Sequence, residues 1–262
     1  PPGIDIPGYR ILAVPLVPTA TNPVDMLGSQ IGTYETTMMR IFHWEAWDTP
    51  QAYLEYNEFD TDGWVRPGEA AWFLFRDGKT LTFEGTKTPT TIGPGEQLGY
   101  YLAINSGWNQ VGNPYNFPID IDAITVIDNM TGNQELLAAT TPLITQGVFW
   151  VWVNGGYQPA VTLQPGEGGW VKKLTTGHGD LFYPAVASTR SAERTVRVSP
   201  EGLEKPPAPP VLPRQSSTES SDSGGGGGCF IQSAGDPLGL SAVRFGFFAL
   251  FLLITAGTRK GR

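Results

Sequence analysis

Carboxylates are the reactive side chains that this sequence carries in greatest number. Glu58, Asp60 and Asp62 alternate along the chain, and Asp120 and Asp122 repeat that spacing. Alternation places side chains on one face of an extended strand, and glycoside hydrolysis needs two carboxyl groups about 5–9.5 Å apart in a cleft. Asp60 and Asp62 are also a weak calcium candidate, although they lack the ligand spacing and terminal Glu of an EF-hand loop. A solvated acidic turn is the alternative that we favour.

Other catalytic patterns are missing from the sequence. His43 sits among apolar residues typical of a strand, where a packed structural histidine is expected, and His178 lies in a turn. The sequence has no Gly-x-Ser-x-Gly elbow, no His-Glu-x-x-His motif or cysteine pair for zinc, and no P-loop or dinucleotide fingerprint. It therefore predicts no catalytic residues, no cofactor and no metal site beyond the calcium candidate.

Tryptophan is the second residue type that needs an explanation, because there are 8 in a chain with few charges. Trp72, Trp108 and Trp170 recur in repeated motifs, and we expect them to pack in the core. Four others are candidates for stacking against sugar rings on a flat β face: Trp44, Trp47, Trp64 and Trp152. Core packing is the alternative for these four.

Charge and cysteine content limit the possible partners. Residues 1–188 carry a net charge of −11 and residues 189–262 a net charge of +3. An acidic body argues against nucleic-acid binding, which requires a basic surface. The single cysteine excludes an intrachain disulfide, so the body must be stabilised by its core.

Short runs of Val, Ile, Phe, Tyr and Trp between turn residues indicate β-strands over most of residues 8–188. The predicted strands are 9–16, 38–45, 52–57, 70–76, 80–84, 98–105, 108–113, 123–128, 147–153, 159–163 and 168–174. Asn154-Gly155-Gly156 and Asp77-Gly78 are hairpin signals. Helical patterns are short, at 24–31 and 133–140. The predicted fold class is all-β.

Two stretches of this region resemble each other. Gly8 to Pro15 aligns with Gly107 to Pro114 at an offset of 99, and Arg66-Pro-Gly-Glu-Ala-Ala-Trp72 aligns with Gln164-Pro-Gly-Glu-Gly-Gly-Trp170 at an offset of 98. Between them, Ile41 to Trp44 parallels Val148 to Trp152. We predict two tandem β-sandwich or barrel-like repeats, 8–95 and 96–188, after an N-terminal extension at 1–7.

These repeated motifs resemble the β-rich repeats found near the C-termini of large secreted bacterial proteins. The resemblance covers roughly residues 8–175, through the Gly-Trp motif that ends in Pro and the Pro-Gly-x-x-x-Trp motif. It implies a non-catalytic accessory module and brings no active-site residues with it. In the residues themselves, Pro-Gly-Glu indicates a type II turn.

A linker is predicted at 189–228. Its proline-rich part, Lys205–Pro213, is expected to be a stiff, extended spacer. Its Ser/Gly-rich part, 215–228, is expected to be a flexible coil. Together they would hold the β body away from whatever follows.

The last segment, 229–262, is typical of a membrane tail. Leu238–Ala256 is mostly apolar and nearly long enough to span a bilayer, and basic residues follow it at the C-terminus. Arg244 is unfavourable there unless it snorkels outward. A buried or signal-like apolar segment is the alternative. The positive-inside rule places the terminus in the cytoplasm and the body on the other side.

Five glycines before Cys229, the apolar segment and the basic end resemble the tripartite C-terminal sorting signals of Gram-negative bacterial surface proteins. The resemblance implies cleavage or modification at Gly228 and Cys229 by a sorting protease or modifying enzyme, in the cell envelope. An unmodified thiol in a flexible leash is the alternative.

We therefore expect a non-enzymatic, surface-anchored β-repeat module. It would serve as a stalk, an adhesion domain or an accessory domain of a larger secreted protein, with a polysaccharide or a surface protein as its partner. The alternative is a glycan-directed hydrolase or carbohydrate-binding module that uses the Asp, Glu and Trp residues. The absence of an N-terminal signal peptide indicates the C-terminal piece of a longer secreted protein, or a mature or truncated form, which leaves a domain upstream of Pro1 open.

Overall fold

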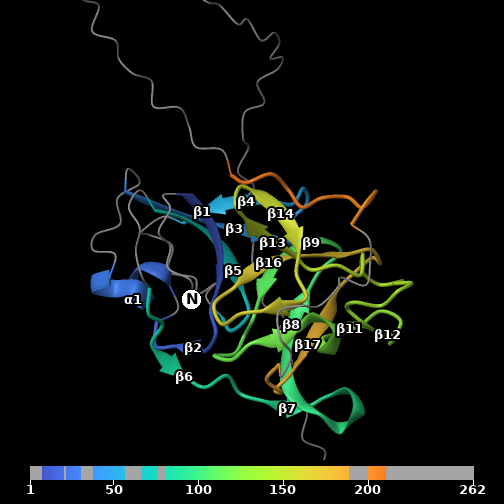
Figure 1. Cartoon of the computed structure of the whole chain (residues 1–262). Coiled ribbons are helices and arrows are strands. Elements are labelled where there is room, and N and C mark those ends of the chain that lie inside the picture. Colours follow the sequence, from blue (N-terminus) through green and yellow to red (C-terminus); the bar gives the residue numbers. More distant parts are fainter. Residues whose placement is uncertain are drawn as a thin grey trace, which may run out of the picture. The chain divides into compact units, whose positions relative to one another are not determined.

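The computed structural model describes residues 8–20, 22–30, 38–56, 66–75, 81–188 and 200–210. These residues form several antiparallel sheets with very little helix, which confirms the all-β prediction (Figure 1). The chain divides into two units, Pro1–Pro213 and Arg214–Arg262. The second unit lies outside the described residues, and with it Gly228, Cys229 and Leu238–Ala256. Among the residues that are described, no helix has the length and apolar character that crossing a membrane requires.

The first sheet has the strand order β1-β5-β3-β4. Its strands are β1 (Gly8–Ala13), β5 (Ala70–Phe75), β3 (Met39–Glu45) and β4 (Ala52–Glu55). Every residue of β5 is buried. Its side chains alternate, so that Trp72 and Leu74 enter one core while Phe73 and Phe75 enter another. A strand buried on both faces explains why this part of the sequence is continuously apolar.

The second sheet has the strand order β14-β13-β16-β9. Its strands are β14 (Gly156–Pro159), β13 (Trp150–Val153), β16 (Gly168–Lys173) and β9 (Gly107–Gly112). The predicted hairpin at Asn154-Gly155 is confirmed, because it joins β13 to β14. Both turn residues have positive φ, 52° and 82°, as a two-residue type I′ turn requires.

The two four-stranded sheets match strand for strand and in register. Gly8 pairs with Phe75 in the first sheet, and Gly107 pairs with Lys173 in the second. In the same way, the pair Phe42 and Trp72 corresponds to Trp150 and Trp170. The outer pair Trp44 and Tyr53 corresponds to Trp152 and Tyr157. We call residues related in this way matched positions.

A third sheet packs on the outer face of the second. Its order is β12-β11-β17-β8-β7, with bounds β12 (Gln134–Leu136), β11 (Thr125–Asp128), β17 (Gly179–Pro184), β8 (Leu98–Ile104) and β7 (Thr91–Ile92). A core that includes Leu102, Val126, Val171 and Leu181 lies between the two sheets.

Two predictions differ from the structure in this third sheet. The strand β17 was not predicted, because Gly179-Asp180 and Pro184 resemble turn residues, yet its central residues Leu181 to Tyr183 are buried. The helix predicted at 133–140 is wrong, since Gln134–Leu136 forms edge strand β12. There Glu135 accepts hydrogen bonds from the backbone of Leu143, Ile144 and Thr145 at 2.7, 3.0 and 2.9 Å, which ties the segment to a neighbouring loop.

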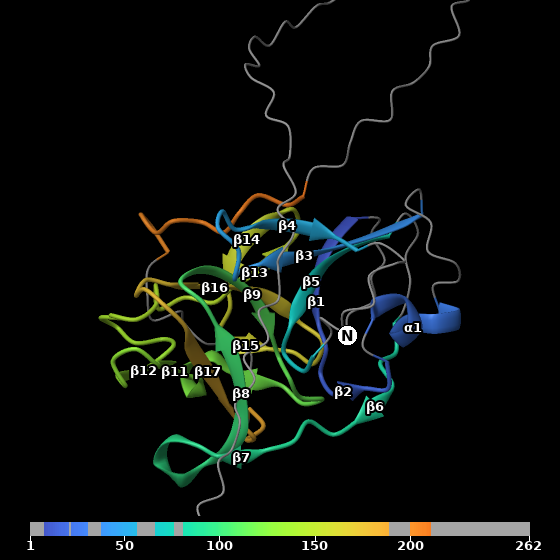
Figure 2. The same ribbon diagram turned by 180° about the vertical axis from the view of Figure 1, so that it is seen from behind.

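Smaller elements complete the body. The predicted helix at 24–31 corresponds to α1 (Pro23–Leu27) and the 3-10 turn η1 (Gly28–Gln30). Met26 and Leu27 cover the outer face of the first sheet. The remaining elements are β2 (Val17–Pro18) paired with β6 (Gly85–Thr86), β10 (Ile119–Asp120) paired with β15 (Thr162–Leu163), and the 3-10 turns η2 (Pro94–Glu96) and η3 (Ile121–Ala123). Seen from both sides, the order of layers is α1, first sheet, second sheet and third sheet (Figure 2).

Tryptophans join the first and second sheets reciprocally. Trp44 of the first sheet meets Trp170 of the second edge-on, with ring centroids 5.4 Å apart. Trp152 of the second sheet meets Trp72 of the first, also at 5.4 Å. Both contacts are T-shaped, the arrangement that aromatic quadrupoles favour. Each sheet therefore supplies a ring to the buried strand of the other, and the prediction that Trp72 and Trp170 pack in the core is confirmed.

The two sheets approach most closely where matched positions touch each other. The amide of Ala13 donates to the carbonyl of Gly166 at 3.0 Å, and its match, Gly112, donates to Gly68 at 2.8 Å. A Cβ added at Gly112 would lie 2.4 Å from the Cβ of Ala13. A Cβ added at Gly168 would lie 2.8 Å from that of Ala70. At each of these two places there is room for one methyl group.

This close approach predicts that Gly112→Ala destabilises the protein by about 1–3 kcal/mol, because an overpacked core must shift its backbone. The measurement is the free energy of unfolding in urea. Gly156→Ala is the matched control, since its added Cβ meets nothing within 4 Å, and we expect a change within about 0.5 kcal/mol. Equal effects of the two substitutions would contradict the proposed close contact.

Candidate functional site

A cleft of about 490 Å³ lies where β3 ends beside β8 and β9. This volume is within the range of small-molecule sites. Its polar lining comes from three parts of the chain: the end of β3, the Pro-Gly-Glu turn before β5, and β9. The residues that matter below are His43, Trp44, Glu45, Trp47, Glu69 and Gln110.

Two of the four candidate tryptophans line this cleft. The indole of Trp44 is held in place, because its Nε1 donates to the carbonyl of Trp108 at 2.9 Å. Trp47 follows in the turn after β3, and its side chain is 56% exposed. Trp152 lies outside the cleft lining and packs against Trp72 and Tyr157. Trp64 lies outside the described residues.

Gln110 is the most informative residue of the cleft. It is only 7% exposed, and neither its Oε1 nor its Nε2 has a hydrogen-bond partner among the described residues. A buried amide without partners costs stability unless a ligand or water completes its hydrogen bonds. The matched position in the first sheet is Ile11, which packs in the core between the sheets. The matched strand of the first sheet therefore packs with an apolar residue, Ile11, at the position where the cleft has the amide of Gln110.

His43 and Glu45 add a second polar pair. They lie two residues apart on β3, and His43 Nε2 and Glu45 Oε1 are within hydrogen-bonding distance. His43 is 9% exposed, so its burial agrees with the sequence prediction, although it also lines the cleft. The matched positions on β13 are Val151 and Val153. The polar character of this face is thus specific to one of the two matched sheets.

Glu69 belongs to the Pro-Gly-Glu turn and also lines the cleft. Burial raises the pKa of its carboxyl group to about 7, and its Oε2 has no partner among the described residues. Burial likewise raises the pKa of Glu167, the matched residue of the second turn. Glu167 accepts a hydrogen bond from the amide of Gln164 at 2.9 Å, within its own turn. The raised pKa is therefore a property of both turns and does not depend on the cleft.

Among the remaining acidic candidates, those that the structure describes do not line the cleft. Asp60 and Asp62 lie outside the described residues. Asp120 accepts hydrogen bonds from Ser188 at 2.7 Å and from Thr162 at 3.2 Å, away from the cleft lining. Within the described ranges, no group of three or more His, Cys, Asp or Glu residues is placed to hold a metal ion.

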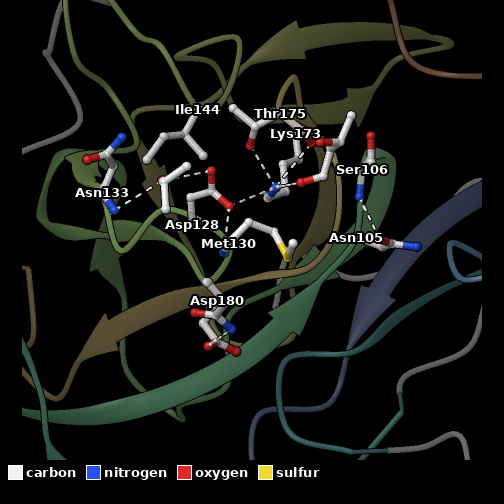
Figure 3. Close-up of polar contacts among 12 residues, drawn as sticks. Asn105, Ser106, Asp128, Met130, Asn133, Ile144, Lys173, Thr175 and Asp180 are labelled. Carbon is white, nitrogen blue, oxygen red and sulfur yellow. Dashed lines mark hydrogen bonds and ion pairs between the residues drawn. The ribbon is translucent and has the colours of Figure 1, made fainter.

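A separate polar cluster surrounds Lys173, which is 1% exposed (Figure 3). Its ammonium donates to Thr175 Oγ1 at 2.6 Å and lies 3.4 Å from Asp128 Oδ1. Asp128 also accepts hydrogen bonds from Met130 and Thr131. Burial raises the pKa of Asp128, but these hydrogen bonds and Lys173 lower it below its usual range. A sealed and satisfied pair such as this one supports the fold and offers no open face to a ligand.

Sequence reasoning found part of this site. It singled out Trp44 and Trp47 by residue type, but it passed over Gln110, Glu45 and Glu69. Gln110 lies inside a repeated strand motif and Glu69 inside a repeated turn motif, so both were interpreted as folding signals. The available signal was the difference between the two motifs, Ile11 against Gln110. No protein-family model, no curated protein and no solved structure matches the chain.

The raised pKa of Glu69 predicts a specific pH dependence of stability. The native state binds this proton more tightly than the unfolded state, whose glutamate pKa is about 4.3. The resulting stabilisation is present below that value and is lost as pH rises through about 7. We expect Glu69→Gln to remove this loss. The free energy of unfolding of the variant, measured relative to that of the native protein at the same pH, should therefore rise by about 1–3 kcal/mol from acid pH to pH 8.

Urea unfolding at about pH 5 and pH 8 measures this difference. Glu167→Gln should change in the same direction, because its carboxyl is perturbed by the same cause. Glu96→Gln, at an exposed position, is the control for the loss of one charge. A Glu69→Gln protein with the same pH profile as the native protein would show that the carboxyl is not buried.

Proposed function

We propose that this chain is a non-enzymatic, surface-anchored β module that binds a glycan in the cleft between His43 and Gln110. The observation that carries the proposal is the buried Gln110 amide, which has no partners among the described residues and lines the same cleft as Trp44 and Trp47. A sugar ring has apolar C–H faces and polar hydroxyl edges. An indole can cover such a face, while an amide and a carboxylate bind the hydroxyls.

The matched sheets support binding as the purpose of this surface. His43, Glu45 and Gln110 have apolar matches in Val151, Val153 and Ile11. Polar residues at these positions are not needed for packing, since the matched positions pack without them. A group that costs stability and serves no packing role is a reasonable candidate for binding.

We also propose that the two matched sheets descend from one duplicated unit, with repeats 8–95 and 96–188. Its support is the pair of sequence offsets, 99 and 98 residues, together with the equal registers of β1-β5 and β9-β16. The third sheet then comes from the second repeat except for its edge strand β7, which lies at the end of the first repeat. As an accessory module, the pair would serve a larger secreted protein.

Location is the third part of the proposal. The C-terminal segment 229–262 would direct the chain to the cell envelope of a Gram-negative bacterium, with processing or modification at Gly228 and Cys229. Leu238–Ala256 would insert in the membrane, leaving the C-terminus cytoplasmic before any processing. The support for this is the order of glycines, cysteine, apolar segment and basic end in the sequence.

A glycan-directed hydrolase is the second candidate. One observation favours it: Glu69, whose pKa is about 7, lines the same cleft as Glu45. A carboxyl group protonated near neutral pH suits a general acid. The matched Glu167 weakens this argument, because burial raises its pKa as well although it is not in the cleft lining.

Glycan binding is tested with the full chain in detergent solution. We expect saturable heat of binding or tryptophan fluorescence change with at least one member of a broad oligosaccharide panel. Gln110→Met should weaken this binding at least about tenfold, since a site that binds a hydroxyl loses its partner. The same variant should be no less stable than the native protein, because it removes a buried amide without partners.

Leu143→Ala is the control for binding, because Leu143 is 79% exposed and lies outside the cleft lining. No binding across the panel, or native affinity in Gln110→Met, would refute the glycan site. Release of reducing sugar by the native chain but not by Glu69→Gln would instead establish the hydrolase.

Anchoring is tested separately by removing 229–262. We expect the shortened chain to appear in the culture medium, because it lacks the apolar segment, while the full chain fractionates with membranes. Continued membrane association of the shortened chain would contradict the anchoring role of the tail.

A further inference from the structure

Residues 200–210 belong to the predicted 189–228 linker, but they lie against the body. The segment crosses the end of the first and second sheets near β4 and β14 (Figures 1 and 2). Leu203 packs against the core between these sheets. Pro206 and Pro210 are buried, whereas Lys205 and Ala208 are exposed. This part of the linker is therefore not a spacer that stands away from the body.

The segment is held by four side chains from the two matched sheets. Tyr9 of β1 donates its hydroxyl to the carbonyl of Pro210 at 2.8 Å, and Tyr157 of β14 donates to the carbonyl of Pro207. Trp108 of β9 donates its Nε1 to Glu204 at 3.1 Å. Lys172 of β16 forms an ion pair with the same carboxylate. We call Tyr9, Trp108, Tyr157 and Lys172 the proline groove.

The sequence of the bound segment favours a polyproline II helix. Its core, Pro206-Pro207-Ala208-Pro209-Pro210, has φ fixed at 4 of its 5 residues. A residue before proline is also biased toward extended backbone. Such a helix has no internal hydrogen bonds, so its carbonyls can accept bonds from a partner.

The chemistry of the groove suits this ligand. Burial raises the pKa of Tyr157 and of Tyr9, so both phenols keep the proton that they donate. Rings of Tyr9 and Trp108, which occupy matched positions, pack edge-on against Trp72 and Trp170 and are thereby fixed in orientation. Aromatic walls with hydroxyl and indole donors are the usual means by which proteins recognise proline-rich peptides.

We propose that the proline groove is a recognition site for proline-rich peptides that carry an acidic residue on their N-terminal side, and that its resident ligand is residues 203–210 of this chain. The bound segment acts as a clasp across the two sheets, because Tyr9 belongs to the first and the other three groove residues to the second. From Glu204 to Pro210 a polyproline II helix covers about 19 Å. The proposal does not depend on the glycan cleft, which has a different lining.

The test removes the resident ligand from the full chain and returns it as a peptide. Replacing Pro206, Pro207, Pro209 and Pro210 by serine removes the backbone preference without changing the groove. A fluorescent peptide with the native sequence of residues 200–210 should bind this variant at least about tenfold more tightly than it binds the native chain, whose own segment competes. The same peptide with serine for proline is the control and should bind weakly.

Adding Tyr9→Phe and Tyr157→Phe to the serine variant should weaken peptide binding about fivefold for each hydrogen bond removed. Near-UV circular dichroism of the clustered tryptophans checks that each variant is folded. A folded serine variant that does not distinguish the proline peptide from the serine peptide would overturn the proposal.

A second measurement does not depend on the serine variant. A spin label is placed at Lys205→Cys in a chain that also carries Cys229→Ser. We expect restricted motion of the label in this chain and release of the label when Tyr9→Phe and Tyr157→Phe are added. A label that moves freely before these substitutions, or one that stays equally restricted after them, would show that the hydroxyls do not hold the segment.

Discussion

The reciprocal packing of tryptophans between the two matched sheets is the contact on which the described body depends. Each sheet has a central strand that is largely buried on both faces, β5 in one and β16 in the other, and each turns its tryptophan toward the opposite sheet. Trp44 covers Trp170 and Trp152 covers Trp72, so neither sheet can bury its own central tryptophan alone. Full burial of each such ring is worth about 1.5–3 kcal/mol. Because the chain has a single cysteine, no intrachain disulfide supports this packing.

Because the tryptophan contacts hold the two sheets together, side chains at other matched positions can differ between the sheets. The cleft occupies one side, where His43, Glu45 and Gln110 replace apolar residues of the matched sheet. The proline groove occupies another side, where Tyr9 and Trp108 use their outer edges to bind a segment while their rings pack inward. In both cases the backbone of a matched position is fixed by strand pairing that the other sheet reproduces with different side chains.

Short-range sequence patterns predicted the features that depend on residues close together in the chain, namely turns and strands. The Asn154-Gly155 turn, the alternating apolar residues and the Pro-Gly-Glu motifs lead to the all-β class and to most central strands. The sequence offsets of 99 and 98 residues between the repeated motifs are also the offsets between matched positions of β1 and β9 and of β5 and β16. Contacts between distant segments were not predictable in this way. Strand β17 is recognisable only by its burial in the third sheet, and Gln110 only by comparison with Ile11. The docking of Pro207 and Pro210 depends on two tyrosine hydroxyls that are far away in the sequence. Composition alone described that last segment as a spacer.

The touching matched positions have a consequence for how the two halves recognise each other. The first half has alanine at both places, Ala13 and Ala70, and the second has glycine at both, Gly112 and Gly168. Two first halves facing each other would bring methyl groups into collision at both places, and two second halves would leave them empty. Packing of a first half against a second half is therefore favoured over packing of two like halves. Each half would therefore pack with the other half of the same polypeptide, and an open-ended assembly of like halves would be disfavoured by the same two methyl groups.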